Sequence, residues 1–443
     1  MVTTLRPRPA TWTHPGWSAV SGWHGGRVEV DERGFRRFWV ASTVSAFGTY
    51  VTTVALQVLV VDDLGGSATD VGLLNAARWV PYLLVGVLVG VLADRLRRRP
   101  VLVASDLGRA AVLAGIPLLA ALDRLNLPSL LVLVVALGLL SLANDAAHQS
   151  FLPRLVPRAG LSRANARLQQ SDAAAQTSGP ALGGVLVAAL GAPVAVLVDA
   201  ASYLVSGVLT ASIRTVEPAP EHRQRHLRRE LAEGVAWVYR HPTLAPLAWS
   251  THAWFLFFSV LGAVYAPFVL TTLDRSPLAL GVTLALTGVG GLLGAGASER
   301  MAAHVGLFRT MAGARLLEAG GIAVVALAAV APGPALVLLG GGQLLVGLGL
   351  GVEGPVDMAY RQGVTPDRLQ GRMNTTMRSA NRAAIVVGAP LGGVLADRAG
   401  SGVALAVSAT GVALTALLLG RTGFRAARLD DAPPAGSGPR RAA

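Results

Sequence analysis

The sequence predicts an all-α integral membrane protein with twelve transmembrane helices in two parallel six-helix repeats. Only 14% of its 443 residues are charged and 52% are hydrophobic, whereas about a quarter of an average soluble chain is charged. Apolar runs recur at roughly the twenty residues that a helix needs to cross a bilayer. Glycines and charged residues also recur at one fixed shift along the chain, which indicates an internal repeat.

Two polar tails and one polar linker divide the chain. Residues 1–37 and 422–443 are rich in Arg, Pro and Gly and predict disordered cytoplasmic tails. The linker 213–246 has Leu and Val at helical spacing beside Arg, which predicts an amphipathic helix on the membrane surface, with an ordinary solvated helix as the alternative. It separates an N-terminal half, 38–212, from a C-terminal half, 247–421. Spans are expected at roughly 38–61, 70–92, 101–121, 128–150, 168–190, 193–212, 247–270, 277–298, 309–331, 334–356, 373–396 and 401–420.

Arginine placement predicts the orientation in the membrane. One set of loops carries 19 arginines, and the opposite set carries only Arg124, Arg275 and Arg398. By the positive-inside rule, the arginine-rich side is cytoplasmic, and so are both termini. The net charge of +13 is therefore explained by topology, and we expect no nucleic-acid partner.

Several chemistries are excluded by missing residue types. All 38 basic residues are arginine, and the chain has no Lys and no Cys. There is thus no P-loop lysine, no Schiff base, no thiol nucleophile and no thiolate metal site. The pattern Gly349-x-Gly351-x-x-Gly354 fits a dinucleotide-binding loop, but it lies within an apolar span with no strand before it. We expect no enzyme activity, no cofactor and no metal.

The internal repeat has a shift of 209 residues. It places Asp106 and Arg109 of the first half on Arg315 and Glu318 of the second half, a charge pair at one spacing with its signs exchanged. Two copies in the same orientation are related by an axis along the membrane normal.

The loop after the second span carries a motif formed by Gly90, Asp94, Arg95, Arg98 and Arg99. It resembles the signature loop of the major facilitator superfamily. The resemblance implies a conformational latch, because an Asp at a cytoplasmic helix end is stabilised by a neighbouring helix N-terminus and by arginines. Arginines that serve only the orientation of the chain are the alternative.

A second motif lies in the fifth span and recurs in the eleventh. Its Gly and Pro residues weaken a helix and allow close packing, as a bending element between two moving halves requires; generic small-residue packing is the alternative. They are Gly179, Pro180, Gly183, Gly184, Gly388, Pro390, Gly392 and Gly393. With the string from Phe151 to Asn165, the first copy resembles the superfamily branch of enterobactin-type siderophore exporters and macrolide efflux proteins. The letters Gly-Val-Leu-Ala-Asp-Arg also recur at 393–398, which we interpret as chance and helix packing.

Ionisable residues deep within spans indicate the coupling site. Glu318 lies roughly 14 Å from the inner end of its helix, near the bilayer midplane, and Arg315, Asp199 and Arg78 are also well inside. Such positions are costly and mark function, so we expect these four residues to couple transport to protons. An ion pair between Arg315 and Glu318 within one helix is the structural alternative.

Aromatic residues indicate the substrate cavity. Seven of the 24 aromatic residues lie in the seventh span, which lines the central cavity of the transporters that this chain resembles. We expect Trp254, Phe258 and His252 to face the substrate with Tyr50 and Thr53 of the first span, because such groups suit large amphiphilic molecules. Rings that face lipid are the alternative.

The residues and the resemblance together imply a monomeric, multi-pass transporter of the bacterial inner membrane. It is expected to export a small amphiphilic drug, antibiotic or siderophore by alternating access in exchange for protons, with the lipid bilayer as its other partner. An uptake permease for a metabolite, and a membrane sensor or scaffold without transport, are the alternatives.

Overall fold

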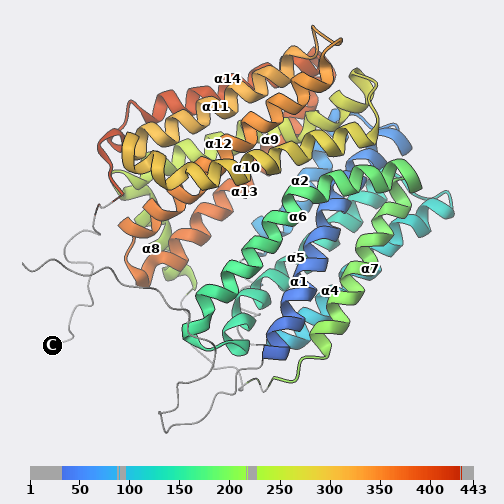
Figure 1. Ribbon diagram of the computed structural model, residues 1–443, viewed down its shortest axis with the longest axis horizontal. Helices are drawn as coiled ribbons and strands as arrows, with labels where there is room; N and C mark the ends of the chain where they lie inside the picture. Colours follow the sequence, from blue (N-terminus) through green and yellow to red (C-terminus); the bar gives the residue numbers. More distant parts are fainter. Residues whose placement is uncertain are drawn as a thin grey trace, which may run out of the picture.

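The computed structural model describes residues 32–86, 89, 96–215, 217, 227–429 and 431, almost all of them in helices. In these residues the N-terminal half has six helices (Figure 1). They are α1 (Glu32–Val58), α2 (Ala68–Leu84), α4 (Arg98–Ala121), α5 (Leu127–Leu155), α6 (Leu161–Leu190) and α7 (Ala192–Ala211). A π-helical turn, η1 (Leu59–Asp63), extends α1, and a 3-10 turn, η2 (Arg158–Gly160), precedes α6.

The C-terminal half repeats this order after the linker helix α8 (Leu227–Arg240). Its first helix also ends in a π-helical turn, and the two π turns are separated by the repeat shift of 209 residues. The elements are α9 (Leu244–Pro267), η3 (Phe268–Thr272), α10 (Pro277–Val305), α11 (Leu307–Leu327), α12 (Ala335–Val364), α13 (Asp367–Ala399), α14 (Ser401–Leu419) and the 3-10 turn η4 (Gly423–Ala426).

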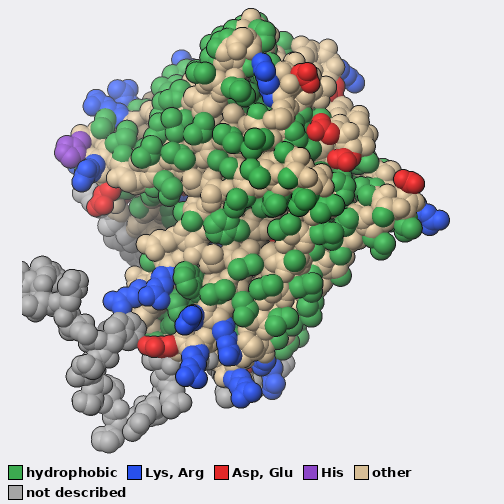
Figure 2. Space-filling view, turned by 45° about the vertical axis from the view of Figure 1, so that its right-hand side comes forward, with side chains coloured by type: hydrophobic (Ala, Val, Ile, Leu, Met, Phe, Trp, Pro, Cys, Tyr) green, Lys and Arg blue, Asp and Glu red, His purple; other side chains and the backbone are tan. Residues whose placement is uncertain are grey.

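The predicted fold class is confirmed. Eleven of the described helices are long and apolar enough to cross a membrane, and α2, with 17 described residues, takes the place of the twelfth span. Exposed apolar side chains such as Leu84, Val132 and Val337 belong to a broad hydrophobic surface, with charged side chains gathered toward the edges (Figure 2). A continuous apolar surface of this size fits contact with lipid rather than with water.

The chain ends reach further into the fold than the sequence suggests. The expected tail 1–37 is wrong at its boundary, because α1 begins at Glu32 and buries Phe35. The expected tail 422–443 is wrong at its start, because Phe424 is fully buried, with its ring centroid 5.3 Å from that of Tyr360. The other tail residues lie outside the described chain, apart from the short stretch that follows η4.

The linker helix α8 is held by the C-terminal half. The Arg372 guanidinium on α13 forms an ion pair with Glu233 of α8, and the indole nitrogen of Trp237 donates a hydrogen bond to the Thr365 hydroxyl at 3.2 Å. Figure 1 shows α8 beside α13. A helix is therefore present where the amphipathic one was predicted, with one side packed on α13; its place on the membrane surface stays a prediction. We call the side of the molecule with α8 the linker face, and the opposite side the distal face.

Glycines set how closely the helices approach. Gly191 and Gly400, equivalent under the repeat, have φ of 80° and 91° in the tight turns before α7 and α14, where a side chain would be strained. A side-chain carbon at Gly347 of α12 would lie 2.0 Å from the carbonyl oxygen of Thr287 on α10. Backbone contact of this kind stabilises helix pairs in lipid, where hydrophobic exclusion does not act between helices.

This packing generates a prediction about stability. Gly347→Ala should lower the melting temperature of the purified protein, because α10 and α12 must separate and overpacking costs about 1–3 kcal/mol. Gly296→Ala on α10 is the matched control, since nothing lies within 4 Å of a side-chain carbon there. Equal melting temperatures of the two variants would show that the contact is not limiting.

Candidate functional site

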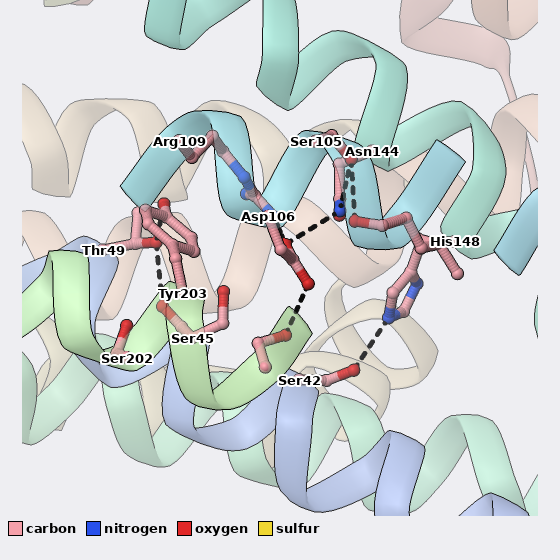
Figure 3. A network of polar contacts seen from close by, with 12 residues as sticks. Ser42, Ser45, Thr49, Ser105, Asp106, Arg109, Asn144, His148, Ser202 and Tyr203 are labelled. Atoms are coloured by element: carbon pink, nitrogen blue, oxygen red, sulfur yellow. Dashed lines mark hydrogen bonds and ion pairs between the residues drawn. The ribbon is translucent and has the colours of Figure 1, made fainter. Parts of the chain in front are cut away.

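The two halves each contain a buried charge cluster at equivalent positions of α4 and α11. In the N-terminal half, Arg109 forms an ion pair with Asp106 of the same helix. Both oxygens of the Asp106 carboxylate have further donors, the Asn144 amide at 3.1 Å and the Ser206 hydroxyl at 2.8 Å. The Arg109 guanidinium also lies 4.1 Å from the centre of the Tyr203 ring. Figure 3 shows these side chains converging from α4, α5 and α7. The two charges of this cluster therefore balance each other, while the Nε atom of Arg109 has no hydrogen-bond partner among the described residues.

Open volume adjoins this first cluster. A cavity of about 330 Å³ is lined by residues of α1, α2, α4, α5 and α7, among them Arg78, Asp106 and Asp199. A second cavity of about 430 Å³ between α1, α5 and α6 shares Ser42 and His148 with it. The described cavities therefore lie in the N-terminal half.

Asp199 and Arg78 stand at the first cavity without pairing to each other. Asp199 is 1% exposed, and one of its oxygens accepts a hydrogen bond from Ser202 at 2.8 Å while the other has no partner among the described residues. Its carboxylate fits against α1 only because Gly48 has no side chain, since a carbon there would lie 2.2 Å from it. Arg78 donates to the Thr53 hydroxyl at 3.2 Å.

The second cluster, in the C-terminal half, contains more acids than arginines. Arg315 on α11 directs its guanidinium to Glu353 on α12, at 2.7 and 2.9 Å, and also donates to two hydroxyl groups of α9. Arg361 pairs with Asp357 at 2.6 Å. The intrahelical ion pair between Arg315 and Glu318, the alternative in the sequence analysis, is not formed. Glu318 is left without a cation in the described structure.

Glu318 is fully buried and bonded to an aromatic side chain. Its carboxylate accepts a hydrogen bond from the Trp254 indole nitrogen at 2.7 Å, and its other oxygen has no partner among the described residues. The Trp254 ring is stacked on Phe258, with centroids 4.5 Å apart and planes 14° apart. Trp254 therefore contacts both Glu318, expected at the coupling site, and Phe258, expected at the substrate cavity.

The other expected substrate residues lie elsewhere. Thr53 receives the hydrogen bond of Arg78, and the side chain of Tyr50 packs against Gly179. His252 joins two elements, with one ring nitrogen 2.8 Å from the Tyr239 hydroxyl of α8 and the other 2.7 Å from the Asn381 side-chain oxygen of α13. These five predicted residues are not gathered around one described cavity, and their contact with substrate stays a prediction.

Two of the six glycines of the Gly-Pro motifs lie where the two halves touch, and the other four pack within their own half. A side-chain carbon at Gly184 of α6 would be 2.7 Å from the Pro277 carbonyl oxygen of α10, and one at Gly393 of α13 would be 2.3 Å from the Ala68 carbonyl oxygen of α2. These two crossings are equivalent under the repeat. Gly179, Gly183, Gly388 and Gly392 face the first helix of their own half in the same way. Pro180 and Pro390 lie inside continuous helices.

Comparison with known proteins agrees with this architecture. The family model of the Major Facilitator Superfamily matches residues 38–389. The chain belongs to the major facilitator superfamily. It is 30% identical over 390 residues to the multidrug efflux pump Tap of Mycolicibacterium fortuitum, which covers 86% of this chain and 92% of the pump. It is 25% identical over 386 residues to the uncharacterized MFS-type transporter YfiS of Bacillus subtilis, covering 85% of this chain and 90% of the other.

Solved structures of the superfamily share the fold. The nucleoside transporter NupG, as a D323A mutant, has a TM-score of 0.71 at 12% identity and covers 87% of this chain and 98% of its own. A bacterial homologue of the iron transporter ferroportin, in an inward-facing state, has a TM-score of 0.70 at 16% identity and covers 88% and 98%. The resemblance to the superfamily is thus confirmed: the chain is a multi-pass membrane transporter, and its relatives are transporters rather than enzymes.

The superfamily's signature loop is described only in part. Gly90, Asp94 and Arg95 lie outside the described residues. Arg98 and Arg99 begin α4, where their backbone N–H groups donate to the carboxylate of Glu217 in the linker, at 2.6 and 2.8 Å. The Arg99 side chain also donates to the Ala211 carbonyl oxygen. The two described arginines of the expected latch are thus bonded to the linker and to α7.

The Gly349-x-Gly351-x-x-Gly354 pattern has a packing role. A side-chain carbon at Gly349 would lie 2.4 Å from the Glu318 side chain, and one at Gly351 would lie 2.1 Å from the Gly291 carbonyl oxygen of α10. Gly349 therefore makes the room that Glu318 occupies. Sequence reasoning assigned no role to this glycine or to Glu353, because their contacts are with residues of other helices.

Proposed function

We propose that this superfamily member exports amphiphilic compounds in exchange for protons, and that Glu318 carries the exchanged proton. The observation that carries the proposal is the position of Glu318, which is fully buried, lacks a cation and is bonded to a tryptophan that stacks on Phe258. Export is supported by the likeness to the multidrug efflux pump Tap, 30% identical over most of the chain.

The charge count supports the choice of Glu318. Arg315 neutralises Glu353, and Arg361 neutralises Asp357, so the third acid of the cluster has no partner cation. An isolated carboxylate away from water is so unfavourable that it binds a proton instead. Glu318 can then bind and release a proton without breaking either ion pair. Arg78 and Asp199 at the cavity of the N-terminal half remain further candidates for coupling, and the balanced Asp106 cluster is better suited to structure.

The acids of α12 offer a way for the proton to leave. Glu353 and Asp357 follow one another by one turn toward the linker end of α12, and their side chains are 12% and 13% exposed, against none for Glu318. We propose that the linker face is cytoplasmic, with both termini there, because the arginine-rich loops belong to it; Figure 2 shows arginines gathered at the lower edge of the molecule. A proton released by Glu318 would thus enter the cytoplasm.

The aromatic pair supplies the link to the substrate. A flat apolar molecule that stacks beside Phe258 and Trp254 gains surface burial and ring contact. Trp254 also donates to Glu318, so a molecule bound at this ring pair lies beside the proton site, and the exchange requires that the two be occupied in turn. A proton that moves down 100 mV supplies about 2.3 kcal/mol, which corresponds to roughly a fifty-fold substrate gradient.

The motion that this mechanism needs is carried by the two halves, 38–212 and 247–421. We propose that they rock about the close crossings at Gly184 and Gly393, with the Gly-Pro motifs as bending elements, and that the loop from Gly90 to Arg99 closes the linker face in the opposite state. A monomer suffices, since each chain carries both halves.

The first test removes the proton. Glu318→Gln keeps an oxygen that can accept the Trp254 hydrogen bond but cannot bind and release a proton. In proteoliposomes with an imposed pH gradient, the variant should lose uphill accumulation of substrate and keep exchange of labelled for unlabelled substrate. Glu299→Gln, an exposed acid at the linker end of α10, is the control and should transport normally. Uphill accumulation by Glu318→Gln at the rate of this control would refute the assignment.

The second test concerns the rings. Trp254→Ala and Phe258→Ala should weaken the export of aromatic compounds relative to other substrates, at unchanged amounts of protein in the membrane. Trp249→Ala is the control on the same helix, because that ring is 64% exposed and should not alter the substrate spectrum. If only sugars or amino acids compete for transport, both the aromatic site and the export of amphiphiles are wrong.

A further inference from the structure

A carboxylate from the second half binds the start of a helix of the first half at the distal face. Asp397, near the end of α13, accepts hydrogen bonds from the backbone N–H groups of Ala68 and Thr69, both at 3.0 Å, and from the Thr69 hydroxyl. Gly393, one turn earlier, has no side chain and so lets α13 touch the same turn of α2. Asp397 belongs to the string 393–398, which the sequence analysis attributed to chance and helix packing; Gly393 does pack on α2, and Asp397 has a partner there that the sequence did not indicate.

The hydrogen-bond inventory of α2 shows why this carboxylate fits. The first four N–H groups of a helix have no partner inside it. In α2, Ser67 and Asp70 form a capping box, which satisfies the N–H groups of these two residues at 2.8 and 3.4 Å. The two N–H groups between them, on Ala68 and Thr69, donate their hydrogen bonds to Asp397. The start of α2 is therefore completed by a residue from the other half.

The equivalent crossing of α6 with α10 lacks the acceptor and one of the two backbone donors. Under the repeat shift, Asp397 corresponds to Ala188, which has no side-chain acceptor, and Ala68 corresponds to Pro277, which has no N–H to donate; Leu278, the counterpart of Thr69, keeps its N–H. The glycines that bring the helices together, Gly393 and its counterpart Gly184, are present at both crossings. The carboxylate is thus present at one crossing and absent at the other.

We propose that Asp397 is a gating residue that holds the distal face closed and thereby favours the state open to the linker face. For the distal face to open, α2 must leave α13, and the carboxylate and both N–H groups must exchange their bond for water. Water is close by, since Asp397 and Thr69 lie at the protein surface, so the contact biases the equilibrium and does not lock it. The inference rests on alternating access in the superfamily and not on the substrate or the coupling ion.

Distances between the halves test this proposal without any transport assay. The chain has no cysteine, so spin labels can be attached to introduced pairs without background. One pair, Arg124→Cys with Val330→Cys, spans the distal face, and another, Arg158→Cys with Glu299→Cys, spans the linker face; all four positions are exposed. Asp397→Ala should lengthen the distal distance, shorten the linker-face distance and raise the ratio of distal-open to linker-open molecules about fivefold to tenfold, the effect of removing a helix cap.

Two further variants separate the link from the stability of α2. Asp70→Ala removes a cap from the same helix end but no contact between the halves, and should leave the distances unchanged. Ala68→Pro removes one of the two donors while keeping a residue suited to the first helical position, and should give a smaller shift that is not additive with Asp397→Ala. Unchanged distances in Asp397→Ala, or an equal shift in Asp70→Ala, would overturn the proposal, and melting temperatures show that each variant is folded.

Discussion

The requirement that charges inside the membrane be neutralised determines much of this structure. Two arginines of the C-terminal half each bind an acid on α12, and Arg109 binds Asp106 in the N-terminal half. Each pair avoids the high cost of an isolated charge in a medium of low polarity. Against this background, a buried carboxyl without an ion pair among the described residues is significant. Glu318 and Asp199 are two such groups, and of the two Glu318 bonds to the stacked tryptophan, from which the proposed coupling follows.

The two halves are related by sequence and have diverged in what they contain. At one crossing of the N-terminal half, Gly48 leaves room for the carboxylate of Asp199, and a cavity adjoins it. At the equivalent crossing of the C-terminal half, Phe257 replaces the glycine and its ring fills the space against Gly411. At this crossing the N-terminal half therefore leaves open volume, while in the C-terminal half the Phe257 ring occupies the space.

The same division applies to the contacts between the halves. Both crossings depend on glycines at equivalent positions, so the close approach of the helices is a property of the repeat. Only the crossing of α2 with α13 adds a charged group, Asp397, to a helix end with free N–H groups. A symmetric scaffold with one asymmetric contact can favour one of two states without losing the ability to reach the other.

The fold could be predicted from sequence because it depends on properties that accumulate over whole segments. Hydropathy predicted the spans, and the 209-residue shift predicted which glycines of the two halves correspond. The orientation predicted from the arginine counts stays a prediction. The boundaries of the folded chain depend on single buried residues, which hydropathy does not reveal. Phe35 and Phe424 are buried, so the folded chain begins earlier and ends later than the sequence predicts.

A site residue could be predicted only where its own depth in the span was enough to identify it. The depth of Glu318 identified it, but its lack of a cation could not be known, because Arg315 turns to Glu353 on another helix. The role of Asp397 was missed because its partner also lies on another helix. Its partner is the start of α2, more than three hundred residues earlier in the chain, and no local pattern records that contact.

Infrared difference spectroscopy of the purified protein, with and without an exported compound, tests the central claim most directly. If Glu318 holds a proton that the substrate displaces, substrate binding should remove a protonated-carboxyl band in the native protein, and this change should be missing in Glu318→Gln. The same band change in both proteins would show that another acid carries the proton, and the assignment of Glu318 would be wrong.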